Sequence, residues 1–236
     1  MQGLIITVDG PSGVGKSTAA RGLAKRLGFL YLDTGAMYRA FGLKTLEMGI
    51  PFADRRALER LASRTEVSFR VDPGHRIRVL LDGADVTELI RSPEVSEAAS
   101  KVATIPGVRR ALVRQQQALG AQGRVVAEGR DTGTVVFPDA PLKFFLTANL
   151  AERARRRHSD LASAGHQASY AQVVREVERR DRRDRERSAS PLRVAQGAIR
   201  IDNSNLKSAK VIATMVDYVQ QFRIGDGDTR GKRRAR

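Results

Sequence analysis

One segment near the N-terminus limits the possible folds of this chain more than any other. Residues 10–17 read GPSGVGKS and match the pattern G-x-x-x-x-G-K-[ST] at every specified position. The apolar run Leu4–Val8 precedes it as a predicted buried strand, and a helical pattern over Lys16–Leu27 follows it. A glycine-rich turn that merely joins strand and helix is the plain alternative. The complete motif in this context predicts a loop that binds the phosphates of a nucleoside triphosphate.

The residue types in this loop suit that task. Glycines let successive backbone N–H groups point at phosphate oxygens, and the helix N-terminus adds partial positive charge. Lys16 is predicted to contact the β- and γ-phosphates, and the Ser17 hydroxyl to bind the Mg²⁺ that accompanies the nucleotide. The predicted triphosphate-binding residues are Gly10, Pro11, Ser12, Gly13, Val14, Gly15, Lys16, Ser17 and Thr18.

Short apolar runs recur along the chain and alternate with helical stretches. They span residues 29–32, 125–127, 142–146 and 198–201. Strands that alternate with helices predict an α/β fold with right-handed crossovers and a parallel sheet covered on both faces. Residues 150–187 are highly charged and are predicted to be mostly helical.

One region departs from this pattern. Apolar residues alternate with polar ones over 67–71 and, in large part, over 77–81, and the turn sequence DPGH lies between them at 72–75. This arrangement predicts an antiparallel hairpin. We expect it to form the centre of an insertion over about residues 63–98.

Composition narrows the remaining possibilities. The 236 residues fit one compact domain, predicted over 1–222, with a disordered basic tail over 223–236. The chain has no cysteine, which excludes disulfides and thiolate chemistry, and three scattered histidines, His75, His158 and His166, argue against a zinc site. No run approaches the roughly 20 apolar residues of a membrane span, and no secretion signal is recognisable, so we expect a cytoplasmic protein without a membrane partner. A formal charge of +16 indicates an anionic partner.

Three further segments are candidates for the rest of the site. DTGAMYR at 33–39 and GRDTGT at 129–134 each follow a predicted strand, so both are expected in one cleft with the phosphate loop. RRDRRDRER at 179–187 is either a solvated helix face with ion pairs such as Asp181 with Arg185, or a mobile flap. Arginines on such a flap would stabilise the charge on a phosphoryl group in transfer.

Four segments together resemble the bacterial cytidylate kinases. They are GPSGVGKS, DTGAMYR, EGRDTGTVVFPDAPLKFFL and RDRRDRERSASPL, in this order and spacing, and the likeness runs from about residue 4 to residue 220. The resemblance implies a P-loop NTPase fold with a five-stranded parallel sheet, the antiparallel β insertion as a nucleotide-binding insert, and a helical lid over about residues 153–187. It also implies ATP-dependent phosphorylation of CMP and dCMP to CDP and dCDP in pyrimidine nucleotide metabolism.

The same resemblance implies roles for individual residues. Arg130 and Arg187 match arginines that hold the phosphate of the acceptor, and with Lys16 they are the implied catalytic residues. The residues implied to bind CMP are Thr34, Tyr38, Arg39, Ser100, Arg109, Arg130, Asp131, Arg180, Asp184 and Arg187. Thr132 departs from the family, which commonly has an apolar residue there, and Arg185 replaces a common serine.

Recognition of cytosine is assigned to three of these residues. Cytosine needs an acceptor opposite its amino group, which Asp131 can supply, and donors opposite N3 and O2, which Arg109 and Ser100 can supply. Alternatively, Asp131 only pairs with Arg130 or caps the turn. No general base is expected because the CMP phosphate is already anionic. Asp33 either holds Mg²⁺ through water or caps the following helix, and a structural or water-mediated role is favoured over direct coordination.

Other functions remain open from the sequence alone. A related kinase for UMP, AMP or a sugar-like acceptor is the nearest, and a nucleic-acid-dependent ATPase is suggested by the charge. The aromatic share of 5% argues against stacking on nucleic acid bases. The segment NSNL at 203–206 does not supply the N-K-x-D of a GTPase. We therefore expect ATP, CMP and dCMP as partners, no specific nucleic acid, and a monomer.

Overall fold

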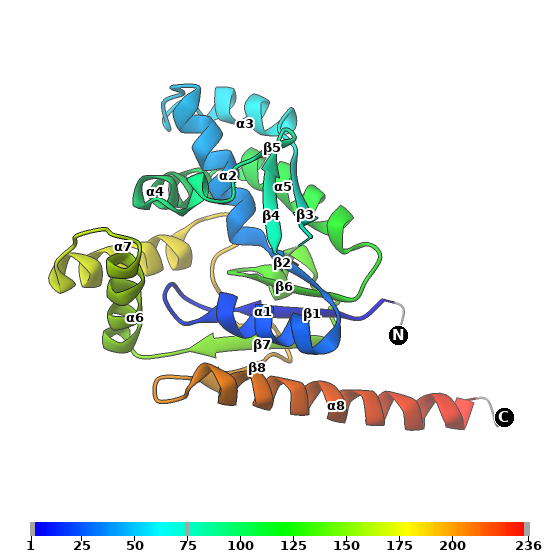
Figure 1. Cartoon of the computed structure of the whole chain (residues 1–236). Helices are drawn as coiled ribbons and strands as arrows, with labels where there is room; N and C mark the ends of the chain where they lie inside the picture. Colours follow the sequence, from blue (N-terminus) through cyan, green and yellow to red (C-terminus); the bar gives the residue numbers. More distant parts are fainter. Residues whose placement is uncertain (1–2, 74–75, 234–236) are drawn as a thin grey trace.

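The centre of the molecule is a five-stranded parallel sheet in the order β2-β6-β1-β7-β8 (Figure 1). The computed structural model describes residues 3–73 and 76–233, with side chains up to residue 222. The strands are β1 Ile5–Asp9, β2 Leu30–Asp33, β6 Val125–Gly129, β7 Leu142–Thr147 and β8 Ile199–Asp202. Each coincides with a predicted strand, so the α/β fold with a parallel sheet is confirmed.

Helices cover both faces of this sheet, which explains why its strands are continuously apolar. Helices α1 (Lys16–Leu27) and α8 (Ser208–Arg233) pack on one face, where Val126 joins their apolar cluster. Val125 and Ala127 point to the opposite face and join the cluster of α2 (Thr34–Glu47), α4 (Pro93–Val102) and α5 (Pro106–Gly120). The alternating directions follow from the two-residue period of a strand.

The predicted hairpin is present and belongs to a small antiparallel sheet. Strand β3 (Val67–Val71) pairs with β4 (Ile77–Leu81), and β4 pairs with the two-residue strand β5 (Ala84–Asp85). Residues 74 and 75 of the predicted turn lie outside the described residues. Helix α3 (Arg55–Ser63) precedes this sheet, and the short helix η1 (Leu89–Arg91) follows it. The limits of the insertion stay a prediction.

Helix α4 leads from the insertion into the core and packs closely on α2. Gly42 of α2 makes this approach possible, because a Cβ atom there would lie only 2.9 Å from the backbone nitrogen of Ala99. Such a distance is far below ordinary van der Waals contact. The insertion is therefore fixed to the helix that carries Thr34, Tyr38 and Arg39.

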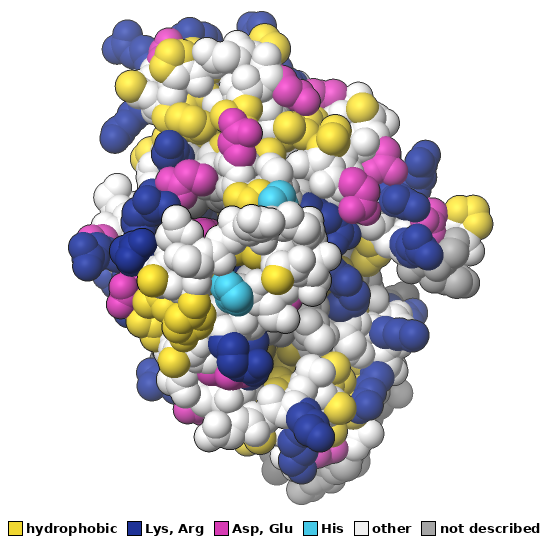
Figure 2. Space-filling model, turned by 60° about the vertical axis from the view of Figure 1, so that its left-hand side comes forward, with side chains coloured by type: hydrophobic (Ala, Val, Ile, Leu, Met, Phe, Trp, Pro, Cys, Tyr) yellow, Lys and Arg dark blue, Asp and Glu magenta, His cyan; other side chains and the backbone are white. Residues whose placement is uncertain are grey.

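The charged segment forms two packed helices at one edge of the molecule, as predicted (Figure 1). Helix α6 (Leu150–Ser163) and helix α7 (Tyr170–Glu186) share a small apolar cluster that includes Leu161, Val173 and Val177. Ser169 and Gln172 form a capping box at the start of α7. We call α6 and α7 the lid. Figure 2 turns this side forward and shows Lys and Arg side chains spread among Asp and Glu over it, rather than gathered in one stripe.

The C-terminal segment differs from the prediction. Disorder was expected over 223–236, whereas α8 continues through Arg233. Extension of an existing helix avoids the cost of nucleation, although each of the three glycines there disfavours the helix by about 1 kcal/mol relative to alanine. Residues 234–236 lie outside the described residues. Among the helices that the structure describes, none combines the length and apolar character of a membrane span.

Candidate active site

The phosphate loop lies between the central strand β1 and helix α1. Gly10, Pro11, Ser12, Gly13, Val14 and Gly15 form the loop, while Lys16, Ser17 and Thr18 begin the helix. Gly13 and Gly15 have φ of 71° and 87°, in the left-handed region that favours glycine. Ser17 and Thr18 are exposed at the start of α1. The backbone required by the sequence motif is therefore present.

Lys16 is held inside this loop in positive surroundings. Its ammonium group donates a hydrogen bond to the Pro11 carbonyl oxygen at 2.7 Å. Burial, followed by the positive charges of Arg130 and Arg180, lowers the pKa of Lys16 to about 7, although Glu128 acts in the opposite direction. An ammonium group in this setting is stabilised by an anion.

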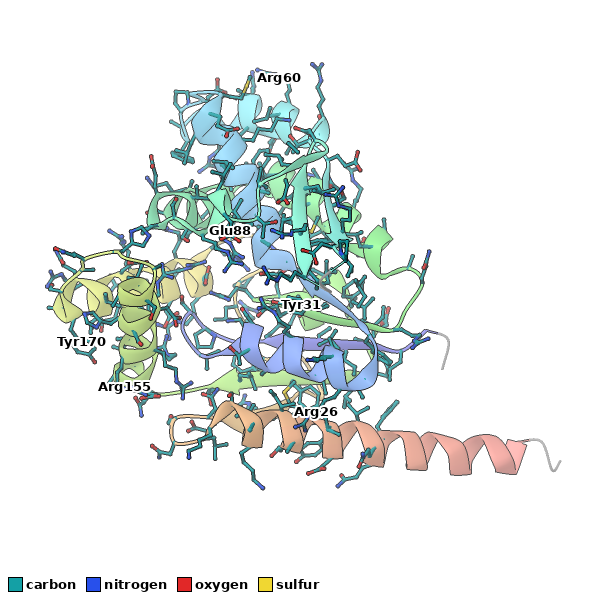
Figure 3. The ribbon with its side chains drawn as sticks, in the orientation of Figure 1. Arg26, Tyr31, Arg60, Glu88, Arg155 and Tyr170 are labelled. Carbon is teal, nitrogen blue, oxygen red and sulfur yellow. The ribbon has the colours of Figure 1, made fainter. Side chains whose placement is uncertain are left out.

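Two acidic residues lie at the carboxyl edge of the sheet beside the loop. Glu128 of β6 is buried, its carboxylate accepts a hydrogen bond from the Tyr31 hydroxyl, and burial raises its pKa. Tyr31, labelled in Figure 3, belongs to β2, and Arg21 of α1 lies 5.3 Å from the centroid of its ring. Asp33 accepts from the Ala36 backbone N–H at 2.8 Å as the N-cap of α2, and pairs with Arg39 at 3.0 Å. Asp33 therefore caps its helix as expected.

Asp9, the last residue of β1, has a role that the sequence did not reveal. Its carboxylate accepts from the Thr132 backbone N–H at 2.9 Å, the Thr132 hydroxyl at 2.8 Å and the Gly133 backbone N–H at 2.7 Å. These bonds hold the π-helical turn η2 (Thr132–Val136), which follows Arg130 and Asp131 directly. They also explain Thr132, whose hydroxyl donates to this buried carboxylate.

A buried group of charged side chains forms around Asp131, the residue that precedes this turn. Asp131 accepts a hydrogen bond from Arg109 Nη2 through one oxygen, and its other oxygen lies 3.4 Å from Arg187 Nη2. The three side chains are only 4–7% exposed. The Arg109 guanidinium stacks over the Tyr38 ring, 5.3 Å from its centroid. Asp131 therefore bridges two arginines from different helices, instead of pairing with Arg130 or only capping the turn.

Three polar atoms around this group have no hydrogen-bond partner among the described residues. They are the Tyr38 hydroxyl, Arg109 Nε and Arg187 Nη2, all buried. Burial also raises the pKa of Tyr38 to about 12, so its hydroxyl keeps its proton. Arg187 Nη2 has its ion pair with Asp131, so the Tyr38 hydroxyl and Arg109 Nε are the two atoms here that are free to bind a polar ligand or water.

The lid contributes more charges to the same edge of the sheet. Asp184 accepts from Arg130 Nε at 2.7 Å and lies 3.8 Å from Arg187. Arg180, one turn away, is half-buried, and burial together with Arg130 lowers its pKa to about 10. The lid thus adds both cations and a carboxylate to the site.

The lid also contacts the phosphate loop directly. Asp181 accepts from the Ser12 backbone N–H at 3.1 Å and pairs with Arg153 of α6, which donates to the Ser12 carbonyl oxygen at 3.1 Å. The ion pair of Asp181 with Arg185 suggested by their spacing is not formed, because Asp181 faces the loop and is buried.

The structure thus brings most of the predicted site residues together at one edge of the sheet. Two of them, Thr34 and Ser100, use their hydroxyl groups in hydrogen bonds that were not predicted. The Thr34 hydroxyl donates to the Glu128 carbonyl oxygen at 2.7 Å. The Ser100 hydroxyl accepts a hydrogen bond from Arg183 at 2.7 Å. Arg183 belongs to the arginine-rich segment but was not among the residues predicted to bind CMP. Both hydroxyls are therefore already engaged within the protein.

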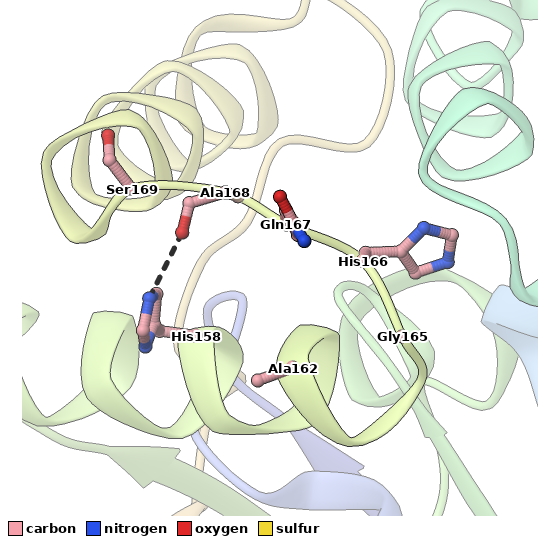
Figure 4. A pocket seen from close by; sticks show the side chains of 7 residues that line it. All are labelled: His158, Ala162, Gly165, His166, Gln167, Ala168 and Ser169. Atoms are coloured by element: carbon pink, nitrogen blue, oxygen red, sulfur yellow. Dashed lines mark hydrogen bonds between the residues drawn. The ribbon is translucent and has the colours of Figure 1, made fainter.

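A hollow at the tip of the lid is separate from this site (Figure 4). It is lined by the α6–α7 connection and includes His158 and His166. His158 is half-buried, with Nε2 3.0 Å from the Ala168 carbonyl oxygen, whereas His166 is exposed. In the part of the chain that the structure describes, no three His, Cys, Asp or Glu residues are grouped as a metal site.

A phosphate loop after the central strand of a parallel sheet, with a lid that brings arginines to it, defines a P-loop kinase. A family model described as cytidylate kinase matches residues 6–221, and the chain belongs to this family. The cytidylate kinase of Pelotomaculum thermopropionicum is 52% identical over 218 residues, 92% of this chain and 96% of that protein. The cytidylate kinase of Carboxydothermus hydrogenoformans is 48% identical over 215 residues, 91% and 96% of the two chains.

A solved structure is similar in fold alone. The crystal structure of an uncharacterized protein from Eubacterium ventriosum has a TM-score of 0.50 at 11% sequence identity, over 93% of this chain and 99% of that one.

Proposed function

We propose that this chain transfers the γ-phosphoryl group of ATP to CMP and to dCMP, giving CDP or dCDP and ADP. The observation that carries the proposal is the position of the Arg109–Asp131–Arg187 group, with its unpaired polar atoms, at the same sheet edge as the phosphate loop. One site suits the triphosphate, and the other suits a small polar acceptor.

In the proposed reaction, an oxygen of the CMP phosphate attacks the γ-phosphorus in line. A bond forms between that oxygen and phosphorus, and the bond from phosphorus to the oxygen bridging the β- and γ-phosphates breaks, so that ADP leaves. No side chain needs to remove a proton, because the attacking oxygen is already anionic.

The main task of the protein is then to bring two polyanions together. Lys16 would contact the β- and γ-phosphates, and Arg130 and Arg187 the acceptor phosphate. Charge-assisted hydrogen bonds of this kind are worth about 1.5–3 kcal/mol each, and those that strengthen as charge is redistributed in the transition state increase the rate. Closure of the lid over the loop would exclude water as a competing acceptor.

The residues beside the loop also suit Mg²⁺. This ion prefers one or two carboxylates together with hydroxyl, water and phosphate oxygens. The exposed Ser17 hydroxyl and the neighbouring Glu128 carboxylate provide such oxygen ligands. When bound, Mg²⁺ supplies neutralisation of charge on the β- and γ-phosphates.

The base would be recognised by Asp131, Arg109 and Ser100. Asp131 would accept from the cytosine amino group, while Arg109 and Ser100 would donate to the ring acceptors. Uracil presents a carbonyl oxygen to the carboxylate and an N3–H to the donors, and each mismatch costs roughly 1–3 kcal/mol. We therefore expect a strong preference for CMP over UMP.

A panel of acceptors tests the proposal. ADP release would be measured with ATP, Mg²⁺ and each of CMP, dCMP, UMP and AMP. We expect high kcat/KM for CMP and dCMP and values at least about a hundredfold lower for the others. A preference for UMP or AMP would overturn it. The monomeric state and the cytoplasmic location stay predictions.

A further inference from the structure

One lid residue contacts the helix that carries Ser100. Arg183 of α7 donates to both carboxylate oxygens of Glu97 on α4, at 3.2 Å from Nη1 and 2.9 Å from Nη2. Nη1 also donates to the Ser100 hydroxyl oxygen at 2.7 Å. A single guanidinium therefore connects the lid to a residue proposed to recognise the base.

The contact is geometrically well defined. Glu97 takes both ends of the guanidinium, an arrangement that fixes its plane as well as its position. Burial alone would raise the pKa of Glu97, but the hydrogen bond and charge of Arg183 lower it. Ser100 is buried, so its hydroxyl exchanges partners with water much less readily than an exposed one. Glu97 thus orients Arg183, and Arg183 in turn donates a hydrogen bond to Ser100.

This contact restricts what the Ser100 hydroxyl can do. An arginine has only donors, so Ser100 cannot donate to Arg183 and must accept from it. One oxygen lone pair is used in this way, and the adjacent positive charge weakens the other as an acceptor. The hydroxyl is therefore biased towards donating its proton elsewhere.

That bias distinguishes the two pyrimidines. Cytosine presents an unprotonated N3, which accepts a hydrogen bond, whereas uracil presents an N3–H. A free serine hydroxyl could satisfy either, because it can donate or accept. A hydroxyl that already accepts a hydrogen bond from a guanidinium donates its own proton, and therefore favours the unprotonated N3 of cytosine over the N3–H of uracil.

We propose that Arg183, oriented by Glu97, is a positioning residue that turns Ser100 into a hydrogen-bond donor for cytosine and so contributes to the choice of CMP over UMP. This inference rests on the proposed function, in which Ser100 contacts the base, and it places the Ser100 hydroxyl opposite N3 and Arg109 opposite O2. It also links recognition to lid position, since Asp184 and Arg187 follow Arg183 and contact Arg130 and Asp131.

The test compares kcat/KM for CMP and UMP in matched variants. Arg183→Met removes all three hydrogen bonds, and we expect the CMP to UMP ratio to fall about tenfold, as suits loss of one charge-assisted bond. Arg183→Lys keeps a charged donor and should return the ratio to within about threefold of wild type. Arg182→Met, an equal loss of charge at the exposed neighbour on the same helix, should leave it unchanged.

A purely structural role for Arg183 gives a different result. Weaker lid closure alone would lower kcat/KM for both nucleotides together and leave their ratio constant, and this outcome would overturn the inference. Should Arg183→Met fail to fold, Glu97→Gln provides the test, because it leaves Arg183 less well oriented. A ratio lowered about threefold supports the inference, and an unchanged ratio refutes it.

Ser100→Ala separates this inference from the proposed function. If Ser100→Ala leaves the ratio unchanged, the Ser100 hydroxyl does not discriminate at N3, and the recognition of cytosine proposed for Ser100 fails. If Ser100→Ala lowers the ratio and Arg183→Met does not, only the role of Arg183 fails. The CMP to UMP ratio of the double variant, Ser100→Ala with Arg183→Met, should equal that of Ser100→Ala alone, because both substitutions act through the same hydrogen bond from the Ser100 hydroxyl to the base.

Discussion

Replacing Asp131 by asparagine should weaken folding as well as base recognition. The substitution keeps size and one acceptor oxygen but removes the negative charge shared by Arg109 and Arg187. Both arginines would then remain buried with less compensation, at 4% side-chain exposure each. The amide can in addition donate to the O4 of uracil, which the carboxylate cannot.

The magnitude follows from the burial of this group. Removing one partner of a buried ion pair costs about 3–5 kcal/mol, and the acceptor oxygen kept by asparagine places Asp131→Asn near the lower end. Little discount for solvent screening applies, because the Asp131 side chain is only 7% exposed. At a urea dependence of about 2–3 kcal/mol per molar, the unfolding midpoint should fall by about 1–1.5 M.

Unfolding should be followed by far-ultraviolet circular dichroism, since the chain contains no tryptophan. Asp139→Asn, the same substitution at an exposed site nearby, is the control and should unfold at the wild-type midpoint. In parallel, the ratio of kcat/KM for CMP to that for UMP should fall in Asp131→Asn. A wild-type midpoint would show that the two arginines do not depend on Asp131, and an unchanged ratio would remove Asp131 from base recognition.

Three further results are expected. Bound phosphates should raise the pKa of Lys16 from about 7, so ATP binding should be accompanied by proton uptake near about pH 8 and by no uptake through Lys16 near about pH 5.5. Calorimetry of ATP binding in buffers of different ionisation enthalpy measures the number of protons taken up. Equal proton uptake by the Lys16→Arg variant would contradict this prediction. Arg130→Ala should lower kcat for CMP at least about a hundredfold and leave the urea midpoint of unfolding almost unchanged, because the charge of Arg130 is needed mainly in the transition state. Loss of activity together with unfolding of the variant would instead indicate that Arg130 mainly forms a structural ion pair with Asp184. Deleting residues 226–236 should leave kcat and KM for CMP unchanged, because the sequence there has no core-forming pattern, and a large loss of turnover would disprove this.

The sheet could be predicted because its signals are local. Val125–Ala127 is apolar throughout since both faces of β6 are covered, and the hairpin alternates with a clear turn between its strands. The two-residue strand β5 is too short to show a period. The continuation of α8 depends on the turns that precede it rather than on the glycine-containing sequence itself.

The site could be predicted only where its residues form contiguous motifs. Lys16 and Ser17 lie in one such motif, and Arg130 and Asp131 in another. The contacts that orient them join residues far apart in sequence: Asp9 meets Thr132 over 123 positions, and Arg183 meets Ser100 over 83. An arginine-rich helix gives no local sign of which side chain faces inward, because Arg182 and Arg183 differ only in the side of the helix that they occupy.

The three hydrogen bonds of Asp9 have a consequence for how the two substrates meet. Asp9 ends the strand that leads into the phosphate loop, and it also anchors the turn behind Arg130 and Asp131. The separation between the sites for donor and acceptor is therefore built into the folded core and does not have to be found anew at each turnover. The spacing of the two segments is thus a result of folding, set by a carboxylate that belongs to the sheet and not to the lid.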